Sequence, residues 1–217
     1  EAEKKMVEKV KTAFPHVAVV LNVGGMLDTS WFKEDEKISA VLLAWQGGIE
    51  GGLAAADILC GDVNPSGKLT DTFAGTLEDY PSSESFHESL DYVNYEEDVY
   101  VGYRYFESFP QAKEKVIYPF GYGLSYTTFE ISVKDLKVEK DKVSVKAEVT
   151  NLGKRAGKEV VQVYYSAPQG KLGKPALELG AFEKSRLLAP GESQTMLLEF
   201  PVSSMGSFDD MGKISRS

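Results

Sequence analysis

Hydrophobic and polar positions follow two different periods along this chain, and the change falls near residue 128. In the first part, apolar residues recur at helical spacing over residues 2–14, and Pro15 ends the predicted helix. Apolar runs within residues 16–25 and 30–45 then predict two buried strands, and residues 50–60 predict a helix that Gly61 closes. Helix, strand, loop, strand and helix in this order predict an α/β fold with a mostly parallel sheet and helices packed on it.

From Phe129 onward the hydrophobic period is two, which is typical of strands. Polar turns at residues 151–153 and 190–192 help to separate five β-type runs, which cover residues 129–140, 142–153, 159–168, 177–188 and 192–202. This spacing predicts an all-β, immunoglobulin-like antiparallel sandwich over residues 129–217, after an α/β domain over residues 1–128. A seven-stranded sandwich would need two more strands after KISRS, and residue 1 is not Met, so we expect a piece of a longer protein.

Charge and cysteine content exclude several classes of partner. A net charge of −9 and a pI of about 4.9 leave no basic surplus for nucleic-acid binding. No run of about 18 apolar residues is present, so we expect no membrane span. Cys60 is the single cysteine; we expect a small buried core residue, with a reactive thiol as the alternative. His16 and His87 are too far apart in sequence to suggest a metal site, and we expect no metal or cofactor.

The most unusual stretch is the glycine loop QGGIEGG at residues 46–52, between a predicted strand and a predicted helix. In parallel sheets, ligands bind at the carboxyl ends of strands, where glycine lets the backbone approach a neighbour closely. Glu50 has two interpretations: an acid that caps the following helix, or a residue that contacts a ligand. A phosphate site is disfavoured because the spacing differs from a P-loop and no lysine follows the glycines.

Three ordered motifs carry a resemblance to a known family. Residues 45–73 (WQGGIEGGLAAADILCGDVNPSGKLTDTF), 100–106 (YVGYRYF) and 118–129 (YPFGYGLSYTTF) are similar to motifs of glycoside hydrolase family 3. The resemblance implies a hydrolase, specifically a retaining, exo-acting β-glycosidase such as a β-glucosidase. It also implies that the first domain is a partial three-layer α/β sandwich, and that the second is a fibronectin type III-like sandwich without its last strands.

In this family the nucleophile is an aspartate on a TIM barrel, and the acid/base glutamate lies early in the α/β domain. The resemblance therefore places both upstream of residue 1, so we expect no catalytic residue in this chain. Retaining chemistry needs two carboxylates about 5–5.5 Å apart, so we expect the chain alone not to hydrolyse glycosides. The implied partners are the missing N-terminal barrel and a glycoside or oligosaccharide substrate.

A noncatalytic carbohydrate-binding or oligomer-forming module is the alternative function. Unpaired sandwich edges would favour a homo-oligomer. The sequence does not indicate a compartment.

Four residues are candidates for the sugar pocket. Asp28 and Trp31 follow a strand end and could face a sugar; alternatively, Asp28 is a helix N-cap and Trp31 a core residue. Gln46 and Glu50 lie in the glycine loop, which the resemblance places near the active-site face.

Three other segments have simpler structural interpretations. Residues 64–67 (NPSG) predict a turn. Residues 95–98 (YEED) predict a solvated acidic loop, although one of its acids could reach a substrate in the intact enzyme. Arg104 is expected to pair with a local carboxylate and to stack on a tyrosine.

Overall fold

The computed structural model describes residues 2–170, 172–208 and 214–215. The chain forms two compact units: unit 1 comprises residues 1–63 with 75–77, and unit 2 comprises residues 64–74 with 78–217. Residues 64–74 and 78–128 thus belong to the same compact unit as the β-rich part. The compact units and the sequence-predicted domains therefore divide the chain at different places.

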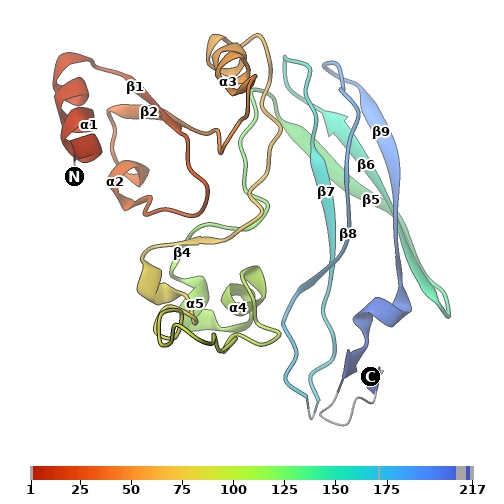
Figure 1. Ribbon diagram of the computed structural model, residues 1–217. Helices are drawn as coiled ribbons and strands as arrows, with labels where there is room; N and C mark the ends of the chain where they lie inside the picture. The colour runs from red at the N-terminus through yellow and green to blue at the C-terminus, as the bar shows by residue number, and fades with distance from the viewer. Residues whose placement is uncertain (1, 171, 209–213, 216–217) are drawn as a thin grey trace. The chain divides into compact units, whose positions relative to one another are not determined.

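Unit 1 contains a two-stranded parallel sheet and three helices (Figure 1). Its elements are α1 (Ala2–Ala13), β1 (Val17–Leu21), α2 (Ser30–Lys33), β2 (Ile38–Leu43) and α3 (Gly51–Cys60). The two strands run parallel, with Val19 opposite Val41 and Leu21 opposite Leu43. The helices and strands predicted from hydrophobic spacing in this region are therefore confirmed, and the short helix α2 is an addition.

Burial within unit 1 is lower than the apolar pattern predicts. Among its described residues, Val17 and Phe32 are the buried hydrophobic side chains, whereas Val20 and Val41 are 43% and 37% exposed. Helices α1 and α3 bury no residue. The prediction of buried strands is wrong for most of these positions, because Val17 is buried and the other residues of β1 and β2 are partly buried or exposed.

Cys60, at the end of α3, is likewise more exposed than its apolar neighbours in sequence predict. The structure leaves its side chain exposed, so the predicted buried position is wrong. The helix does end as predicted, because Gly61 adopts the left-handed conformation with φ of 82°.

The first part of unit 2 consists of short elements around a small aromatic core. These are β3 (Phe73–Ala74), α4 (Tyr103–Ser108), α5 (Pro110–Lys113) and β4 (Val116–Tyr118), with a 3₁₀ turn at Leu77–Asp79 that straddles the two units. Strands β3 and β4 pair antiparallel. Ala74, Phe106 and Ala112 are buried together, so the helices and this strand pair share one core.

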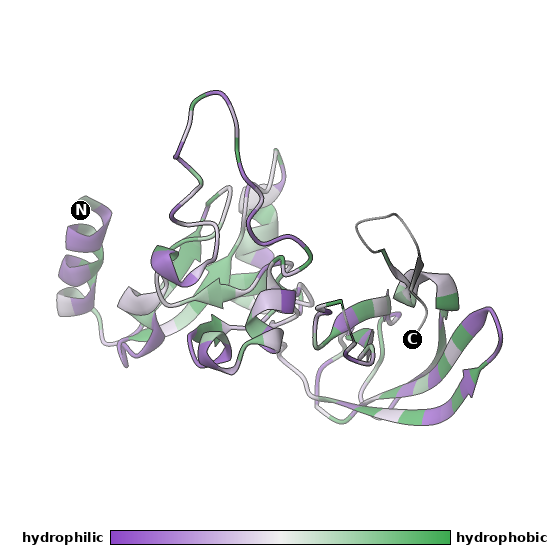
Figure 2. Cartoon of the chain, turned by 90° about the horizontal axis from the view of Figure 1, so that it is seen from below, coloured by the Kyte–Doolittle hydropathy of each residue, from purple (hydrophilic) through white to green (hydrophobic). Residues whose placement is uncertain are grey.

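The β-rich part of unit 2 confirms the five predicted strands. They are β5 (Phe129–Val138), β6 (Lys142–Asn151), β7 (Val160–Tyr165), β8 (Glu178–Lys184) and β9 (Ser193–Pro201). All pairings are antiparallel, in a sheet of order β5-β6-β9 and a β7-β8 pair. Figure 2 shows hydrophilic and hydrophobic positions alternating along the long strands, as the period of two predicts.

One buried cluster joins the two sheets of the β-rich part. Val149 of β6, Leu198 of β9 and Val161 of β7 belong to it, together with Leu188 from the loop after β8. Shorter pieces follow β9, namely a 3₁₀ turn at Val202–Met205, β10 (Ser207–Phe208) and β11 (Ile214–Ser215). The expectation that two further strands follow KISRS concerns positions that the structure does not describe.

Candidate functional site

The carboxyl ends of β1 and β2 bring two loops together in unit 1. The strands are parallel, so residues 22–29 and 44–50 leave the sheet at the same edge. The amide of Ala44 donates a hydrogen bond of 2.9 Å to the carbonyl of Leu21. A Cβ at position 24 would lie 3.2 Å from Nε2 of Gln46, so Gln46 packs directly against Gly24. This edge is where ligands bind in open α/β sheets.

The backbone path of the loop explains two of its glycines. A Cβ on Gly47 would lie only 2.7 Å from the Cα of Gly51, which no side chain tolerates. Gly48 has φ of 65°, a conformation that favours glycine. The loop therefore folds back on itself tightly as it enters α3.

Trp45 stands immediately before this loop in a strained conformation. Its φ is 51°, which is rare for a bulky side chain. Such a conformation costs about 1–3 kcal/mol, and residues of this kind cluster at functional sites. The strain supports the choice of this edge as the candidate site.

Glu50 occupies the N-cap position of α3, yet its side chain makes no capping hydrogen bond. The carboxylate is exposed. The capping interpretation is thus right about position, where the field of the helix favours a carboxylate, and no capping hydrogen bond accompanies it. Contact with a ligand stays a prediction.

Asp28 is held by its neighbours. Its Oδ1 accepts hydrogen bonds from the amide of Ser30 at 2.9 Å and from the Ser30 hydroxyl at 2.5 Å, and Lys4 Nζ lies 3.7 Å from its Oδ2. The Ser30 hydrogen bonds, helped by Lys4, lower the pKa of Asp28 below its usual 3.8, so the carboxylate is ionised at neutral pH. The N-cap of α2 is Thr29, so the alternative that placed the cap at Asp28 is wrong by one residue.

Trp31 is partly buried beside Phe32. The two rings meet edge to face with centroids 4.8 Å apart. The core interpretation is therefore partly right. The roles of Asp28, Trp31, Gln46 and Glu50 in sugar binding stay predictions.

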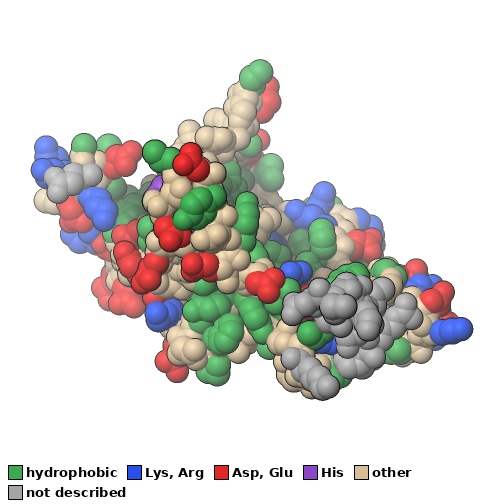
Figure 3. All heavy atoms as spheres, turned by 60° about the horizontal axis from the view of Figure 1, so that its bottom comes forward, with side chains coloured by type: hydrophobic (Ala, Val, Ile, Leu, Met, Phe, Trp, Pro, Cys, Tyr) green, Lys and Arg blue, Asp and Glu red, His purple; other side chains and the backbone are tan. Residues whose placement is uncertain are grey.

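Charged and hydrophobic side chains are interspersed at the surface. On the face drawn in Figure 3, acidic and basic side chains lie close to one another, and hydrophobic side chains are exposed among them. The described residues contain no group of three or more His, Cys, Asp or Glu that could hold a metal ion. No helix among them is long and apolar enough to cross a membrane.

Asn64 of the NPSG motif has a role that the sequence did not reveal. Its Oδ1 accepts hydrogen bonds from the Ser125 hydroxyl at 2.9 Å and the Tyr126 amide at 2.8 Å, while its Nδ2 donates to the Ala156 carbonyl at 2.9 Å. Residues 64–69 contain no turn, so the turn prediction is wrong. The asparagine instead joins three separate segments of unit 2.

The first family motif (residues 45–73), which contains Asn64, also contacts the third motif (residues 118–129) through Lys68. Its Nζ donates to the Gly123 carbonyl at 2.8 Å and forms an ion pair of 2.9 Å with Glu159. A Cβ on Gly123 would lie 2.2 Å from the carbonyl oxygen of Gly67. The first and third motifs thus meet backbone to backbone.

Helix α4, which carries the YRYF motif, is fixed to the segment that leads into β8. The hydroxyl oxygens of Tyr103 and Ser108 each accept a hydrogen bond of 2.8 Å, from the amides of Leu179 and Ala176. Arg104 lies 3.7 Å from Glu178, which confirms a carboxylate partner, although one distant in sequence. Among the described residues, Arg104 stacks on no tyrosine in a cation–π contact.

The predicted acidic loop at residues 95–98 forms a turn, because the Asp98 amide donates to the Tyr95 carbonyl at 3.2 Å. Tyr95, Glu96 and Asp98 are exposed. Exposure supports the interpretation of this segment as a solvated loop.

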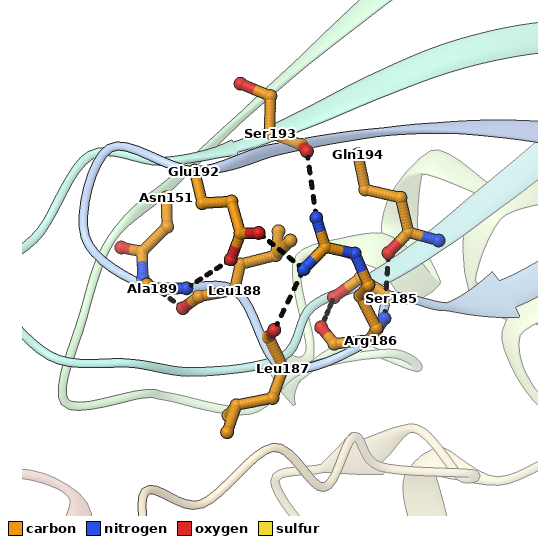
Figure 4. A network of polar contacts seen from close by, with 9 residues as sticks. All are labelled: Asn151, Ser185, Arg186, Leu187, Leu188, Ala189, Glu192, Ser193 and Gln194. Atoms are coloured by element: carbon orange, nitrogen blue, oxygen red, sulfur yellow. Dashed lines mark hydrogen bonds and ion pairs between the residues drawn. The ribbon is translucent and has the colours of Figure 1, made fainter.

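The loop after β8 is closed by a polar network (Figure 4). Arg186 forms an ion pair of 2.6 Å with Glu192, and its amide donates to Gln194 Oε1 at 2.8 Å. Buried Asn151 donates to the carbonyl of Leu188 at 2.9 Å. These contacts place Leu188 in the core and have no visible link to chemistry.

These observations define a chain that joins an α/β unit, with a glycine-rich loop at the carboxyl edge of parallel strands, to an antiparallel β-rich part. The glycosyl hydrolase family 3 C-terminal domain matches residues 1–126, and the fibronectin type III-like domain matches residues 159–215. The chain therefore belongs to glycosyl hydrolase family 3, by its C-terminal domain.

Curated relatives and solved structures agree with this assignment. The chain is 60% identical to β-glucosidase A of Butyrivibrio fibrisolvens over 233 aligned residues, which cover 100% of this chain and 28% of the relative. It superposes on a β-glucosidase of Paenibacillus barengoltzii with a TM-score of 0.92 and 52% identity, covering 98% of this chain and 23% of that one. The β-glucosidase of Kluyveromyces marxianus gives a TM-score of 0.89 with 40% identity, covering 99% and 25%. The chain thus spans about a quarter of these relatives and matches their C-terminal portion.

Proposed function

We propose that this chain is the C-terminal portion of a retaining, exo-acting β-glycosidase of the β-glucosidase type. The observation that carries the proposal is the parallel strand edge, where strained Trp45 and the glycine loop meet the β1 loop, in a chain 60% identical to a named β-glucosidase. In this proposal the edge forms part of a sugar pocket. Gln46 and Glu50 offer hydrogen bonds to sugar hydroxyls. Asp28 lies on the neighbouring loop, and Trp31 lies in helix α2, which follows that loop.

The proposal also assigns the finer architecture. Residues 1–128 form part of a three-layer α/β sandwich domain with a mostly parallel sheet, and residues 129–217 form a fibronectin type III-like sandwich. The parallel β1-β2 pair and the core shared by the β5-β6-β9 sheet and the β7-β8 pair support it.

The catalytic carboxylates are proposed to lie in the parent protein outside this chain. Asp28 is engaged with Ser30 and Lys4, which leaves it poorly placed as a nucleophile. We therefore expect the isolated chain to show no turnover of an aryl β-glucoside, since retaining hydrolysis needs two carboxylates about 5–5.5 Å apart.

A chimera tests the proposal directly. The chain replaces the matching segment of β-glucosidase A of Butyrivibrio fibrisolvens, and hydrolysis of aryl β-glucoside is measured. We expect an active hybrid in which Gln46→Ala and Glu50→Ala each raise KM about twofold to tenfold, the effect of losing one hydrogen bond. Glu84→Ala, at an exposed position outside the proposed pocket, serves as the control and should leave KM unchanged. Turnover by the isolated chain, or a folded hybrid without activity, would contradict the proposal.

A noncatalytic module that forms oligomers is the second candidate, and strand β5 favours it. Ile131, Val133, Leu136 and Val138 lie opposite buried residues of β6, yet they are 47–70% exposed. An apolar row of this kind is suited to cover by a second copy. Sedimentation of the chain distinguishes the two candidates: a stable dimer that Val133→Lys disrupts favours the module, and a monomer counts against it.

A further inference from the structure

Three lysines of unit 2 gather where strand β7 begins and strand β8 ends. Lys158 precedes β7, Lys184 is the last residue of β8, and Lys68 comes from the first family motif. Lys158 and Lys68 lie close enough to Lys184 for their charges to repel its ammonium group, and Glu159 is the carboxylate that attracts it. Three cations and one anion leave two positive charges at this place, in a chain whose net charge is −9.

The strand register brings Lys158 and Lys184 to the same face of the β7-β8 pair. Lys184 lies opposite Val160. The antiparallel course continues before β7, because the amide of Ser185 donates a hydrogen bond of 2.8 Å to the carbonyl of Glu159. Side chains alternate along an extended chain, so Lys158 projects to the same side as Val160 and its partner Lys184. Diagonal neighbours of this kind are within reach of each other when their side chains are long.

Glu159 is already engaged and does not neutralise the cluster. Its Oε1 accepts a hydrogen bond of 2.7 Å from the amide of Val160 and forms an ion pair of 2.9 Å with Nζ of Lys68. Lys68 also donates to the carbonyl of Gly123 at 2.8 Å, and its side chain is 18% exposed, so this pair is held in place.

The other two ammonium groups have no partner of their own. Lys158 and Lys184 are exposed, and neither forms a hydrogen bond or an ion pair with a residue that the structure describes. Partial burial lowers the pKa of Lys184 below its usual 10.5, and the charges of Lys158 and Lys68 lower it further. An anion between these groups would replace their mutual repulsion with attraction.

The surplus of two positive charges defines the chemistry of the anion. A phosphate monoester carries a charge of about −1.5 to −2 at pH 7, and lysine binds phosphate oxygens as a point charge. A long polyanion such as a nucleic acid does not match, because the chain as a whole is acidic and would repel it.

We propose that Lys158 and Lys184, together with the anchored Lys68, bind a phosphate group, either as the free ion or as a small phosphate monoester. The site is separate in sequence and in compact unit from the candidate pocket of unit 1. It does not depend on the proposed glycosidase function.

The test titrates the 217-residue chain with inorganic phosphate, glucose 6-phosphate and D-glucose at low salt, followed by ¹H–¹⁵N NMR. We expect both phosphates to cause saturable shifts of the amides of residues 157–160 and 183–186, and D-glucose to cause none there. Added sodium chloride should weaken binding, because exposed charges are screened. Tighter binding of glucose 6-phosphate than of inorganic phosphate would assign the site to the ester, and equal binding would assign it to the phosphate group alone.

Lys158→Gln and Lys184→Gln should each weaken phosphate binding about threefold to tenfold, because each removes one charge-assisted hydrogen bond. Lys140→Gln removes the same charge at the exposed turn between β5 and β6; it is the matched control and should bind as the original chain does. In the absence of phosphate, Lys184→Gln should not lower the unfolding temperature, since it removes a charge that its neighbours repel.

The pKa of Lys184 provides a second measurement. Bound phosphate should raise this pKa, as followed by ¹³C NMR of the lysine side chain, because a nearby anion favours the charged form. Shifts that do not saturate, or equal phosphate binding by the original chain and Lys184→Gln, would overturn the proposal. An equal loss of binding in Lys140→Gln would do so as well. Hydrolysis of aryl β-glucoside by the chimera is measured separately, so failure here is distinguishable from failure of the proposed glycosidase role.

Discussion

The carboxamide of Asn64 accepts a hydrogen bond of 2.9 Å from the hydroxyl of Ser125, across 61 positions of sequence. The same oxygen also accepts the amide of Tyr126, and the nitrogen donates to Ala156. A single side chain thus connects the first family motif, the third family motif and the loop between β6 and β7. Its removal should affect unit 2 much more than unit 1.

Asn64→Ala should lower the free energy of unfolding of unit 2 by about 2–3 kcal/mol, because three hydrogen bonds are lost at about 0.5–1.5 kcal/mol each. Urea unfolding followed by far-ultraviolet circular dichroism measures this change. Asn94→Ala, which removes one 3.3 Å contact of an exposed asparagine, should change stability by under about 0.5 kcal/mol. Equal effects of the two variants would refute the bridging role.

Gly123→Ala should destabilise unit 2 by about 1–3 kcal/mol or more, because its Cβ would meet the carbonyl oxygen of Gly67 at 2.2 Å. The obstacle is backbone, which cannot rotate away as a side chain would. Gly170→Ala is the control, since nothing lies within 4 Å of a Cβ there. If thermal unfolding shows Gly123→Ala to be as stable as the control, the close contact of the motifs is incorrect.

Two glycine-to-alanine substitutions in the glycine loop should change the stability of unit 1 in opposite directions. Gly48→Ala forces an L-residue to φ of 65° and should destabilise unit 1 by about 1–2 kcal/mol. Gly52→Ala lies within α3 with open space around it, and should stabilise the unit by about 0.5–1 kcal/mol. Urea titration monitored by tryptophan fluorescence reports both, because Trp31 and Trp45 belong to this unit. A shift in the same direction for both variants would contradict the loop conformation.

Asp28 should titrate below its usual pKa of 3.8, because the Ser30 hydroxyl and amide bind its ionised form. Since the folded-state pKa is lowered, the stabilisation by this carboxylate is complete at neutral pH and is lost as the pH falls past the usual 3.8 and through the lowered pKa. Ser30→Ala should move the pKa of Asp28 back towards 3.8, as measured by carboxyl ¹³C NMR. Lys4→Met should move it less, because the Lys4 ion pair is long and exposed. No change in Ser30→Ala would exclude the hydrogen-bond explanation.

Most of the secondary structure could be predicted from the sequence, because hydrophobic periodicity and the glycine and proline residues that end helices and strands are local properties. The helix over residues 2–14, the five β-type runs and the left-handed Gly61 all depend on neighbours within a few positions. Burial was predicted poorly: Val20, Val41 and Cys60 have apolar neighbours in sequence, but exposure depends on what covers them in space.

The candidate site was predicted in part for a similar reason. Consecutive parallel strands place Gln46 beside Gly24, and the need for close approach explains Gly47. The left-handed Trp45 has no local sequence signal, since no glycine or asparagine marks that position.

The exposed thiol of Cys60 has a practical consequence, because it is the sole cysteine among 217 residues. A maleimide dye or nitroxide would attach at one defined point, at the last position of α3 in unit 1. Unit 2 contains no cysteine and would stay unlabelled. Spectroscopy on the labelled chain would therefore report the melting of the α/β unit at that point, without engineering a new attachment point.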